Sequence, residues 1–202
     1  TGRAGVCLST LGPGATNLVT GLACAYMDSV PMVAITGQVS TALMGRDAFQ
    51  ETDVLGMVSP ITKHAFLIER AEDIVPTIER AFAIAEGGRP GPVLVDIPKD
   101  VQNAMASAPG SAIARTRPAP PDHREIEAAA RLLARAERPL IVAGHGVRLA
   151  RAHAELRELA ERIDAPVAMT LLGLGAFPED HPLALGMLGM HGSARTNRAV
   201  NE

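Results

Sequence analysis

Three groups of residues have types and positions that could do chemistry. Gly12-Pro13-Gly14 follows an apolar run, Phe49-Gln50 follows a polar loop, and Lys99 follows the mainly apolar run 93–97 after one proline. Binding sites gather at the carboxyl ends of parallel strands, so an ammonium group after such a strand could attract a carboxylate. A glutamine amide can donate and accept hydrogen bonds at once without adding charge. These residues are therefore the first candidates for a binding site.

Each group also has an ordinary structural interpretation. Glycine and proline favour a plain strand-to-helix turn, and Phe49 beside Gln50 fits a core residue next to a surface residue. Lys99 could be solvated and paired with Asp96 or Asp100. The glycine turn is not a phosphate loop, because it lacks the Gly-Lys-Ser/Thr ending and the three-glycine spacing of a dinucleotide fingerprint. From the pattern alone, the structural interpretations are the more frequent ones.

Alternating strand and helix patterns must position these residues. Short apolar runs predict buried strands at 5–10, 32–36 and 93–97, and a shorter strand at 65–68. Helical spacing predicts helices at 15–27, 48–58 and 72–86, and a loop fills 37–46. Strands rich in Val, Ile and Ala that alternate with helices indicate an α/β fold with parallel sheets flanked by helices.

The composition changes between residues 101 and 122, where Pro, Ala, Gly and Ser occur without a period. Such a stretch is typical of a linker between domains. Beyond it the pattern predicts helices at 125–136 and 147–163, strands at 140–143 and 167–170, and a helix from residue 193. The chain starts without Met inside a strand and stops inside a helix, so we expect an internal piece with two incomplete α/β domains.

Composition excludes several classes of function. The 202 residues carry a net charge of −3 with four Phe, one Tyr and no Trp, which argues against nucleic-acid binding. No segment has the length of a membrane span or the pattern of a signal peptide. Cys7 and Cys24 are interpreted as reduced core residues of a cytoplasmic protein, and no His/Cys cluster has zinc spacing, so no metal ligand is predicted in this chain.

Five motifs in their order resemble one enzyme family. They are GPGATNLVTGLACAYMDSVPMVAITGQ, GRDAFQETD, PITKH, GRPGPVLVDIPKDVQ and LGMLGMHG. Together they resemble the large catalytic subunit of acetolactate (acetohydroxyacid) synthase, which depends on thiamine diphosphate. The likeness covers nearly the whole chain except the linker.

The resemblance implies a domain organisation. Residues 1–101 would be the C-terminal part of the pyrimidine-binding domain, 102–122 a linker, and 123–202 the N-terminal part of the central, flavin-contacting domain. The cofactor-activating glutamate of the family would lie upstream of this chain. The domain that binds the diphosphate and Mg²⁺ would lie downstream.

The resemblance also implies roles for individual residues. Gln50 and Lys99 would be catalytic, with Gln50 reaching cofactor or substrate. Positions that correspond to cofactor contacts are Gly12, Pro13, Gly14, Gln50, Arg89, Gly144, Gly146, Thr170, Leu171, Leu188, Gly189, Met190 and His191; from Arg89 onward these would contact FAD. The substrate channel would be lined by Ser40, Ala48, Phe49 and Lys63. The bare turn at Gly12 would let the chain approach the pyrimidine side of the cofactor.

This sequence departs from the family at three places. Leu11 stands where relatives often have Ser, and His145 where they often have Gly. Ser40-Thr41-Ala42 replaces Pro-Arg-Arg, so two cations at the mouth of the channel are absent. The third departure admits related carboligases and decarboxylases as alternatives to the biosynthetic enzyme.

The implied reaction is decarboxylation of pyruvate followed by ligation of the two-carbon unit to a second 2-keto acid, a step in branched-chain amino acid synthesis. Active sites of the family lie between subunits, so a homodimer or tetramer is implied, with a small regulatory subunit as a further partner. Alternatives are glyoxylate carboligase, sulfoacetaldehyde acetyltransferase, and a 2-keto acid oxidase or decarboxylase. A cofactor-binding fragment without catalysis also remains open.

Overall fold

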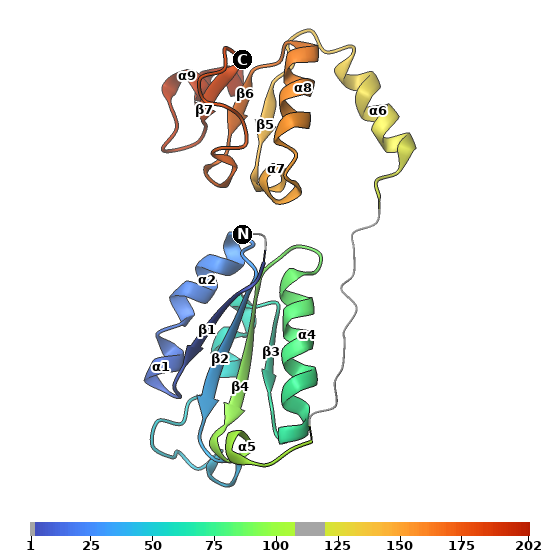
Figure 1. Ribbon diagram of the computed structural model, residues 1–202. Helices are drawn as coiled ribbons and strands as arrows, with labels where there is room; N and C mark the ends of the chain where they lie inside the picture. The colour runs from blue at the N-terminus through green and yellow to red at the C-terminus, as the bar shows by residue number, and fades with distance from the viewer. Residues whose placement is uncertain (1–2, 108–119) are drawn as a thin grey trace. The chain divides into compact units, whose positions relative to one another are not determined.

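The computed structural model describes residues 3–107 and 120–202, which form two compact units on either side of residues 108–119 (Figure 1). Most of the predicted linker 102–122 lies outside the described residues. Helix α5 (Lys99–Asn103) extends two residues past the expected boundary at 101. Helix α6 (His123–Leu133) begins where the second domain was expected to start.

The first unit is built on a sheet of four parallel strands in the order β1-β2-β4-β3. The strands are β1 (Gly5–Ser9), β2 (Met32–Gln38), β3 (His64–Leu67) and β4 (Pro92–Pro98). The helices are α1 (Pro13–Thr16), α2 (Val19–Met27), α3 (Val54–Val58), α4 (Ile74–Glu86) and α5, with 3₁₀ turns η1 (Thr41–Leu43), η2 (Ser59–Ile61) and η3 (Ala71–Asp73). The predicted parallel α/β fold is therefore confirmed.

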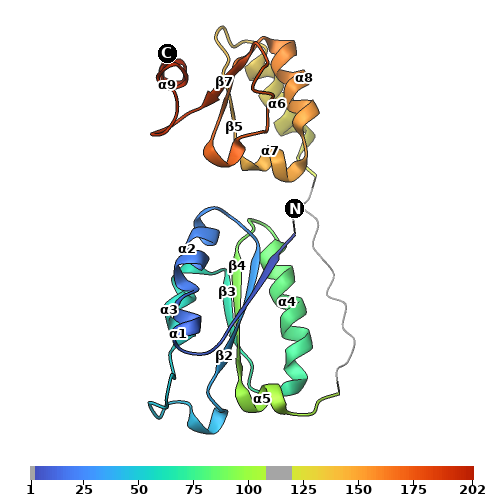
Figure 2. The same ribbon diagram turned by 60° about the vertical axis from the view of Figure 1, so that its left-hand side comes forward.

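Helices cover both faces of this sheet (Figures 1 and 2). On one face α4 packs Ala81 and Ala85 against Val93 and Val95 of β4. On the other face a second cluster joins α1, α2 and α3 to β2 and β4: Ala15, Leu22, Ala34, Val54, Val58 and Leu94. All seven residues of β4 are buried, as expected of a central parallel strand covered on both faces.

Strand β1 corrects one expectation. Residues 5–9 form the predicted strand, but β1 is an edge strand and not a buried one. Cys7 packs toward α2, while Val6 and Leu8 are 59% and 77% exposed. Cys24 is also exposed, so it is not a core residue; both thiols are free. A short apolar run cannot by itself distinguish a central strand from an edge.

Two predicted helices of the first unit form differently. The helix expected at 15–27 is interrupted at Asn17–Leu18 between α1 and α2. The helix expected at 48–58 exists only from Val54, where the Asp53 carboxylate caps it by accepting the Gly56 N–H at 2.9 Å. Phe49 and Gln50 therefore lie in a turn before α3 and not at the start of a helix.

The second unit contains a parallel sheet in the order β5-β6-β7. Its strands are β5 (Ile141–Ala143), β6 (Val167–Met169) and β7 (Ala184–Met187). Besides α6, its helices are α7 (His145–Ala150), α8 (His153–Ile163) and α9 (Ala194–Asn201), with a 3₁₀ turn η4 (Leu171–Gly173). Leu156 and Ala160 of α8 pack on Val167, Met169 and Phe177.

The second unit also differs from expectation in two places. The single helix predicted at 147–163 is split into α7 and α8, because Arg151 takes a left-handed conformation with φ 56°. Strand β7 carries no assignment in the sequence analysis. The helix predicted from residue 193 is confirmed as α9, and the Ser193 hydroxyl caps it by accepting the Thr196 N–H at 3.0 Å. Among the described residues, no helix is both long and apolar enough to cross a membrane.

Candidate functional site

The carboxyl ends of β1, β2 and β4 meet at one edge of the first sheet. A pocket of about 420 Å³ opens there between residues 8–11, the end of β2 and the start of α5. Lys99 and Gln102 of α5 line it together with Gly37 and Gln38, and no carboxylate is among its lining residues. The volume lies within the usual range for small-molecule sites. The predicted position of Lys99 at this edge is thereby confirmed, while its role stays a prediction.

Gly12 and Gln50, which are far apart in sequence, are in contact at this edge. A Cβ on Gly12 would lie 2.6 Å from the Gln50 carbonyl oxygen and 2.9 Å from the Gln50 Cβ, closer than real side chains approach. Gly12 also has φ 56°, a conformation that favours glycine. Gly14 is restricted as well, since a Cβ there would meet Ser9 and Thr10 side chains. The bare turn thus has a reason within the chain, and an approach to a cofactor remains a prediction.

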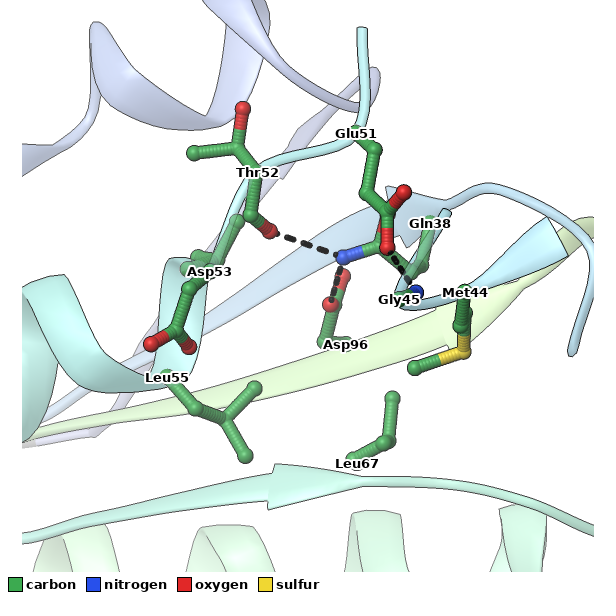
Figure 3. Close-up of a pocket in the computed structure, with 10 residues that line it drawn as sticks. Gln38, Met44, Gly45, Glu51, Thr52, Asp53, Leu55, Leu67 and Asp96 are labelled. Atoms are coloured by element: carbon green, nitrogen blue, oxygen red, sulfur yellow. Dashed lines mark hydrogen bonds between the residues drawn. The ribbon is translucent and has the colours of Figure 1, made fainter. Parts of the chain in front are cut away.

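The segment 44–53, which carries Gln50, consists of consecutive tight turns. Gly45, Asp47 and Gln50 all have positive φ angles. The Glu51 carboxylate accepts the backbone N–H group of Gly45 (Figure 3). It also accepts the N–H group of Ala48, at 2.9 Å. These backbone hydrogen bonds hold the pKa of Glu51 below its ordinary value, and the bond from Ala48 has the largest effect. Phe49 lies in the same segment and is 86% exposed, so its ring can form one side of a binding site.

A buried carboxylate lies beneath this segment, on β4. Asp96 is fully buried and accepts the Thr36 hydroxyl at 2.7 Å and the Gln38 amide at 3.1 Å. Burial raises the pKa of Asp96, and the two hydrogen bonds offset part of that effect. Gln38 and Asp96 both line a second pocket of about 200 Å³ (Figure 3). The sequence analysis missed Asp96 as a site residue, although a single acid within VLVDIP was a visible signal.

Lys99 is not paired with Asp96 or Asp100, as it would be if it were an ordinary surface lysine. Asp96 is engaged with Thr36 and Gln38, and Asp100 accepts both the backbone N–H of Thr41, at 3.0 Å, and the Thr41 hydroxyl. Hydrogen bonds from Thr41 lower the pKa of Asp100. Within the described residues, no carboxylate lies within ion-pair distance of the Lys99 ammonium. The ammonium group is therefore available to a ligand.

Two of the predicted site residues lie at the amino edge of the sheet instead. Lys63 precedes β3 and donates to the carbonyl oxygens of Ile84 and Gly87 that end α4, the second at 2.6 Å. Arg89 precedes β4 and donates to the Ser29 hydroxyl at 2.7 Å and the Met27 carbonyl at 3.2 Å. Lys63 and Arg89 thus bind carbonyl oxygens at the C-terminal ends of α4 and α2. The structure does not bring them together with Gln50 and Lys99.

The channel residues of the β2 loop are grouped near the first site. Ser40 directly precedes η1, and Thr41 connects this turn to Asp100 at the start of α5. Ala48 lies in the segment 44–53, where its N–H group donates to the Glu51 carboxylate. These residues adjoin the segment that carries Gln50, whereas Lys63 does not.

In the second unit, four predicted flavin-contacting residues meet at the carboxyl edge of β5, β6 and β7. The Thr170 N–H donates to the Ala143 carbonyl at 3.0 Å, and the Leu188 N–H donates to the Met169 carbonyl at 3.0 Å. Gly144 begins α7 beside Thr170, and Leu171 is 68% exposed. The structure therefore assembles Gly144, Thr170, Leu171 and Leu188 from three strand ends.

The remaining predicted flavin contacts of the second unit surround the same edge. Gly189 has φ 97°, and its N–H and carbonyl are both bound by the Asn197 side chain, at 2.8 and 2.9 Å. Met190 is 90% exposed, and His191 is exposed beside it. Gly146 has open space around it. Asn197, which the sequence analysis did not select, orders the loop after β7.

We expect Gly173→Ala to disrupt this second edge. A Cβ on Gly173 would press on the Ala143 carbonyl oxygen and lie 3.1 Å from the Gly144 Cα, so the turn after β5 must move. Overpacking of this kind costs roughly 1–3 kcal/mol. Urea unfolding of the variant measures the loss. Gly146→Ala is the matched control, because nothing lies within 4 Å of its Cβ. Equal stability of the two variants would contradict the expected packing.

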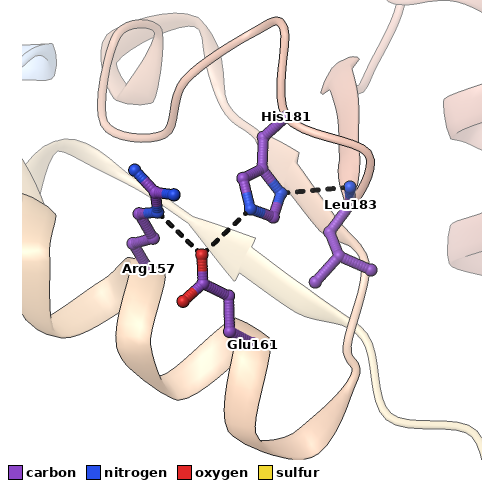
Figure 4. A network of polar contacts seen from close by, with 4 residues as sticks. All are labelled: Arg157, Glu161, His181 and Leu183. Atoms are coloured by element: carbon purple, nitrogen blue, oxygen red, sulfur yellow. Dashed lines mark hydrogen bonds and ion pairs between the residues drawn. The ribbon is translucent and has the colours of Figure 1, made fainter.

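A polar network holds the loop between η4 and β7 (Figure 4). The Glu161 carboxylate of α8 binds Arg157 at 2.7 Å and His181 Nε2 at 3.1 Å. Because His181 Nδ1 accepts the Leu183 N–H at 3.2 Å, the proton of the neutral ring is on Nε2. The ring also packs edge-on against the buried Phe177. This network stabilises the loop that leads into β7 and is separate from the strand-end residues.

Comparison with known proteins gives consistent matches for both units. Residues 1–57 match the family model of the thiamine pyrophosphate enzyme N-terminal TPP binding domain, and residues 126–202 match that of the thiamine pyrophosphate enzyme central domain.

No group of three or more His, Cys, Asp or Glu side chains among the described residues could hold a metal ion.

The similar curated proteins carry one kind of name. The chain is 54% identical over 213 residues to the probable acetolactate synthase large subunit of Methanocaldococcus jannaschii, with 100% of this chain and 35% of that protein covered. It is 51% identical over 212 residues to the acetolactate synthase of Arthrospira platensis, covering 100% and 36%. It is 50% identical over 202 residues to the isozyme 2 large subunit of acetolactate synthase from Escherichia coli, covering 100% and 37%. The chain thus spans about a third of the length of these relatives.

Proposed function

Because the chain belongs to the thiamine pyrophosphate enzymes, we propose that it is part of an acetolactate synthase large subunit. The proposed reaction decarboxylates pyruvate and joins the two-carbon unit to a second 2-keto acid. The observation that carries the proposal is identity of 45–54% to acetolactate synthases over all or nearly all of the chain. The pocket at the carboxyl edge of the first sheet supports it independently.

The residues at this edge fit the pyrimidine end of thiamine diphosphate. The pocket of about 420 Å³ has mainly apolar and amide groups and no acid in its lining. The glycine turn follows directly on Leu11 of this lining, so Gly12, Pro13 and Gly14, with Gln50 in contact with Gly12, would hold the cofactor beside the pocket. When bound, the cofactor supplies an electron sink for decarboxylation. The diphosphate and Mg²⁺ would be held by residues outside this chain.

Lys99 and Gln50 would act on the 2-keto acid. In the described part of the chain the Lys99 ammonium has no carboxylate partner, and it lines the pocket, so it can attract the carboxylate of a substrate. The Gln50 amide can donate to one substrate oxygen and accept from another group without adding charge. The chain's contribution is therefore binding and orientation, which can lower a barrier substantially when the geometry is fixed.

The edge of the second sheet would bind FAD. Gly144, Thr170, Leu171 and Leu188 converge there, and the exposed Leu171 and Met190 offer apolar surface for a ring system. Gly146, Gly189 and His191 complete the proposed set in this unit. We propose a structural role for the flavin, since acetolactate formation requires no net redox change.

The proposal extends to partners. Several relatives are named large subunits, so a small regulatory subunit is a proposed partner. We also propose a homodimer or tetramer with active sites between subunits, in the cytoplasm.

The function can be tested by exchanging this chain into a relative. The alignment with Escherichia coli isozyme 2 spans 202 residues, the length of this chain, so the exchange requires no net insertion. We expect the chimera, with thiamine diphosphate, Mg²⁺ and FAD, to form acetolactate from pyruvate. Circular dichroism and gel filtration establish that it folds. A folded chimera that forms no acetolactate would contradict the proposal.

A second candidate is another carboligase of the same enzyme group. It is favoured by Ser40-Thr41-Ala42, where Thr41 hydrogen-bonds to Asp100 and no cation is present. The same chimera distinguishes the two candidates when glyoxylate and sulfoacetaldehyde are offered in place of pyruvate.

A further inference from the structure

The buried carboxylate of Asp96 has no place in the proposed chemistry. It has no exposed surface, and it lies opposite Thr36 in the β2–β4 register. A buried acid costs stability unless its oxygens are hydrogen-bonded. The contacts of Asp96 continue through Gln38 to the loop that carries Gln50 (Figure 3).

Hydrogen bonding fixes the Gln38 amide completely. Its nitrogen donates to Asp96 Oδ2 at 3.1 Å and to the Thr52 carbonyl at 3.0 Å, and its oxygen accepts the Val39 N–H at 2.9 Å. The two N–H groups of the amide are thereby both used. Without Asp96, one of these N–H groups would be buried and unpaired, which favours an altered amide orientation and a weaker bond to Thr52.

Thr52 lies two residues from Gln50, whose left-handed backbone is pressed against Gly12. The Thr52 carbonyl also accepts the Val54 N–H that leads into α3. A shift at Thr52 would therefore be passed to Gln50 by the covalent chain.

We propose that Asp96 is a positioning residue, which acts through Gln38 and the Thr52 carbonyl to place Gln50 at the carboxyl edge of the sheet. The statement that Gln50 meets substrate there rests on the proposed function. The placement of the loop rests on the hydrogen bonds alone.

The chain itself offers a direct probe of loop order, because it contains no tryptophan. Phe49→Trp introduces a single tryptophan at an exposed position next to Gln50, and excitation near its red edge avoids the fluorescence of Tyr26. In this background we expect Asp96→Ala to lower the fluorescence anisotropy of Trp at position 49 and to speed amide exchange in residues 44–53. Asp96→Asn keeps an oxygen for Gln38, so we expect it to preserve most of the anisotropy.

Thr36→Val is the matched control. It removes the other hydrogen bond to Asp96 and leaves Gln38 and Thr52 untouched. We expect a lower urea midpoint with unchanged anisotropy. If Asp96→Ala mobilises the loop no more than Thr36→Val does, the proposal is overturned.

Kinetics in the isozyme 2 chimera, with Phe49 unchanged, provide the second readout. We expect Asp96→Ala to lower kcat about tenfold and to add little to the loss caused by Gln50→Ala, because both act through the same group. Additive losses would contradict action through Gln50. If the chimera is inactive but Asp96→Ala still loosens the loop, the carboligase assignment fails and the positioning role is supported.

Discussion

Replacement of Gly12 by alanine is expected to destabilise the first unit by several kcal/mol and to displace Gln50. The Gly12 backbone, with φ 56° and ψ −116°, lies in a region that L-residues rarely adopt, which costs an alanine roughly 1–3 kcal/mol. The new Cβ would also lie 2.6 Å from the Gln50 carbonyl oxygen, and such overpacking adds roughly 1–3 kcal/mol. Urea unfolding measures the sum, and amide exchange in residues 44–53 reports the displacement.

Gly45→Ala separates the two contributions. Gly45 has φ 74° in the same segment, but no atom lies within 4 Å of its Cβ position. The variant should therefore lose only the conformational part. If Gly12→Ala is no less stable than Gly45→Ala, the contact between the glycine turn and Gln50 is not significant.

The second large effect concerns two lysines that should respond in opposite ways. Lys99→Met in the isozyme 2 chimera is expected to lower acetolactate formation at least tenfold with little change in the free energy of unfolding. A hydrogen bond to a charged group is worth roughly 1.5–3 kcal/mol, which corresponds to about tenfold or more in rate. Little stability is lost because the Lys99 ammonium has no internal carboxylate partner among the described residues.

Lys63→Met is the matched variant with the reverse expectation. Its ammonium binds two carbonyl oxygens that end α4, so its loss should cost stability by roughly 1–3 kcal/mol. Activity per folded molecule should be largely retained. Parallel steady-state kinetics and urea titrations of both variants provide the comparison. If the Lys63 variant folds normally but lacks activity, this expectation is wrong and Lys63 belongs to the substrate site after all.

The parts of the fold that were predictable are those where one physical signal dominates. Strand β4 is an apolar run interrupted only by Asp96, and α4 has helical spacing with glycine after its end, so both were located within two residues. The segment 48–53 was not predictable, because its conformation depends on positive φ angles at Asp47 and Gln50. The hydrogen bonds to Glu51 within this segment are local, but the contact of Gln50 with Gly12 is tertiary and cannot be read from the segment itself. Strand β7 was missed because it has only four residues, and one of them is Gly186, which interrupts the apolar pattern.

The site was predictable to a similar extent. Lys99 follows a strand and was correctly expected at the carboxyl edge, since parallel strand ends meet there. Lys63 and Arg89 were selected by resemblance alone, and the structure engages both at helix ends. Asp96 required knowledge of its neighbours, because Thr36 and Gln38 lie about 60 residues away in the sequence.

The bond between Thr41 and Asp100 has an evolutionary consequence. The two residues are 59 positions apart, yet Asp100 adjoins Lys99 and Thr41 lies in the turn that departs from the family. A mutation that returns a cation to position 41 would change the electrostatic surroundings of Lys99 at the same time. A substitution in either segment would therefore alter the surroundings of the other. The mouth of the channel and its lysine would be expected to change together within a lineage, and the order of the substitutions would determine which of them is tolerated.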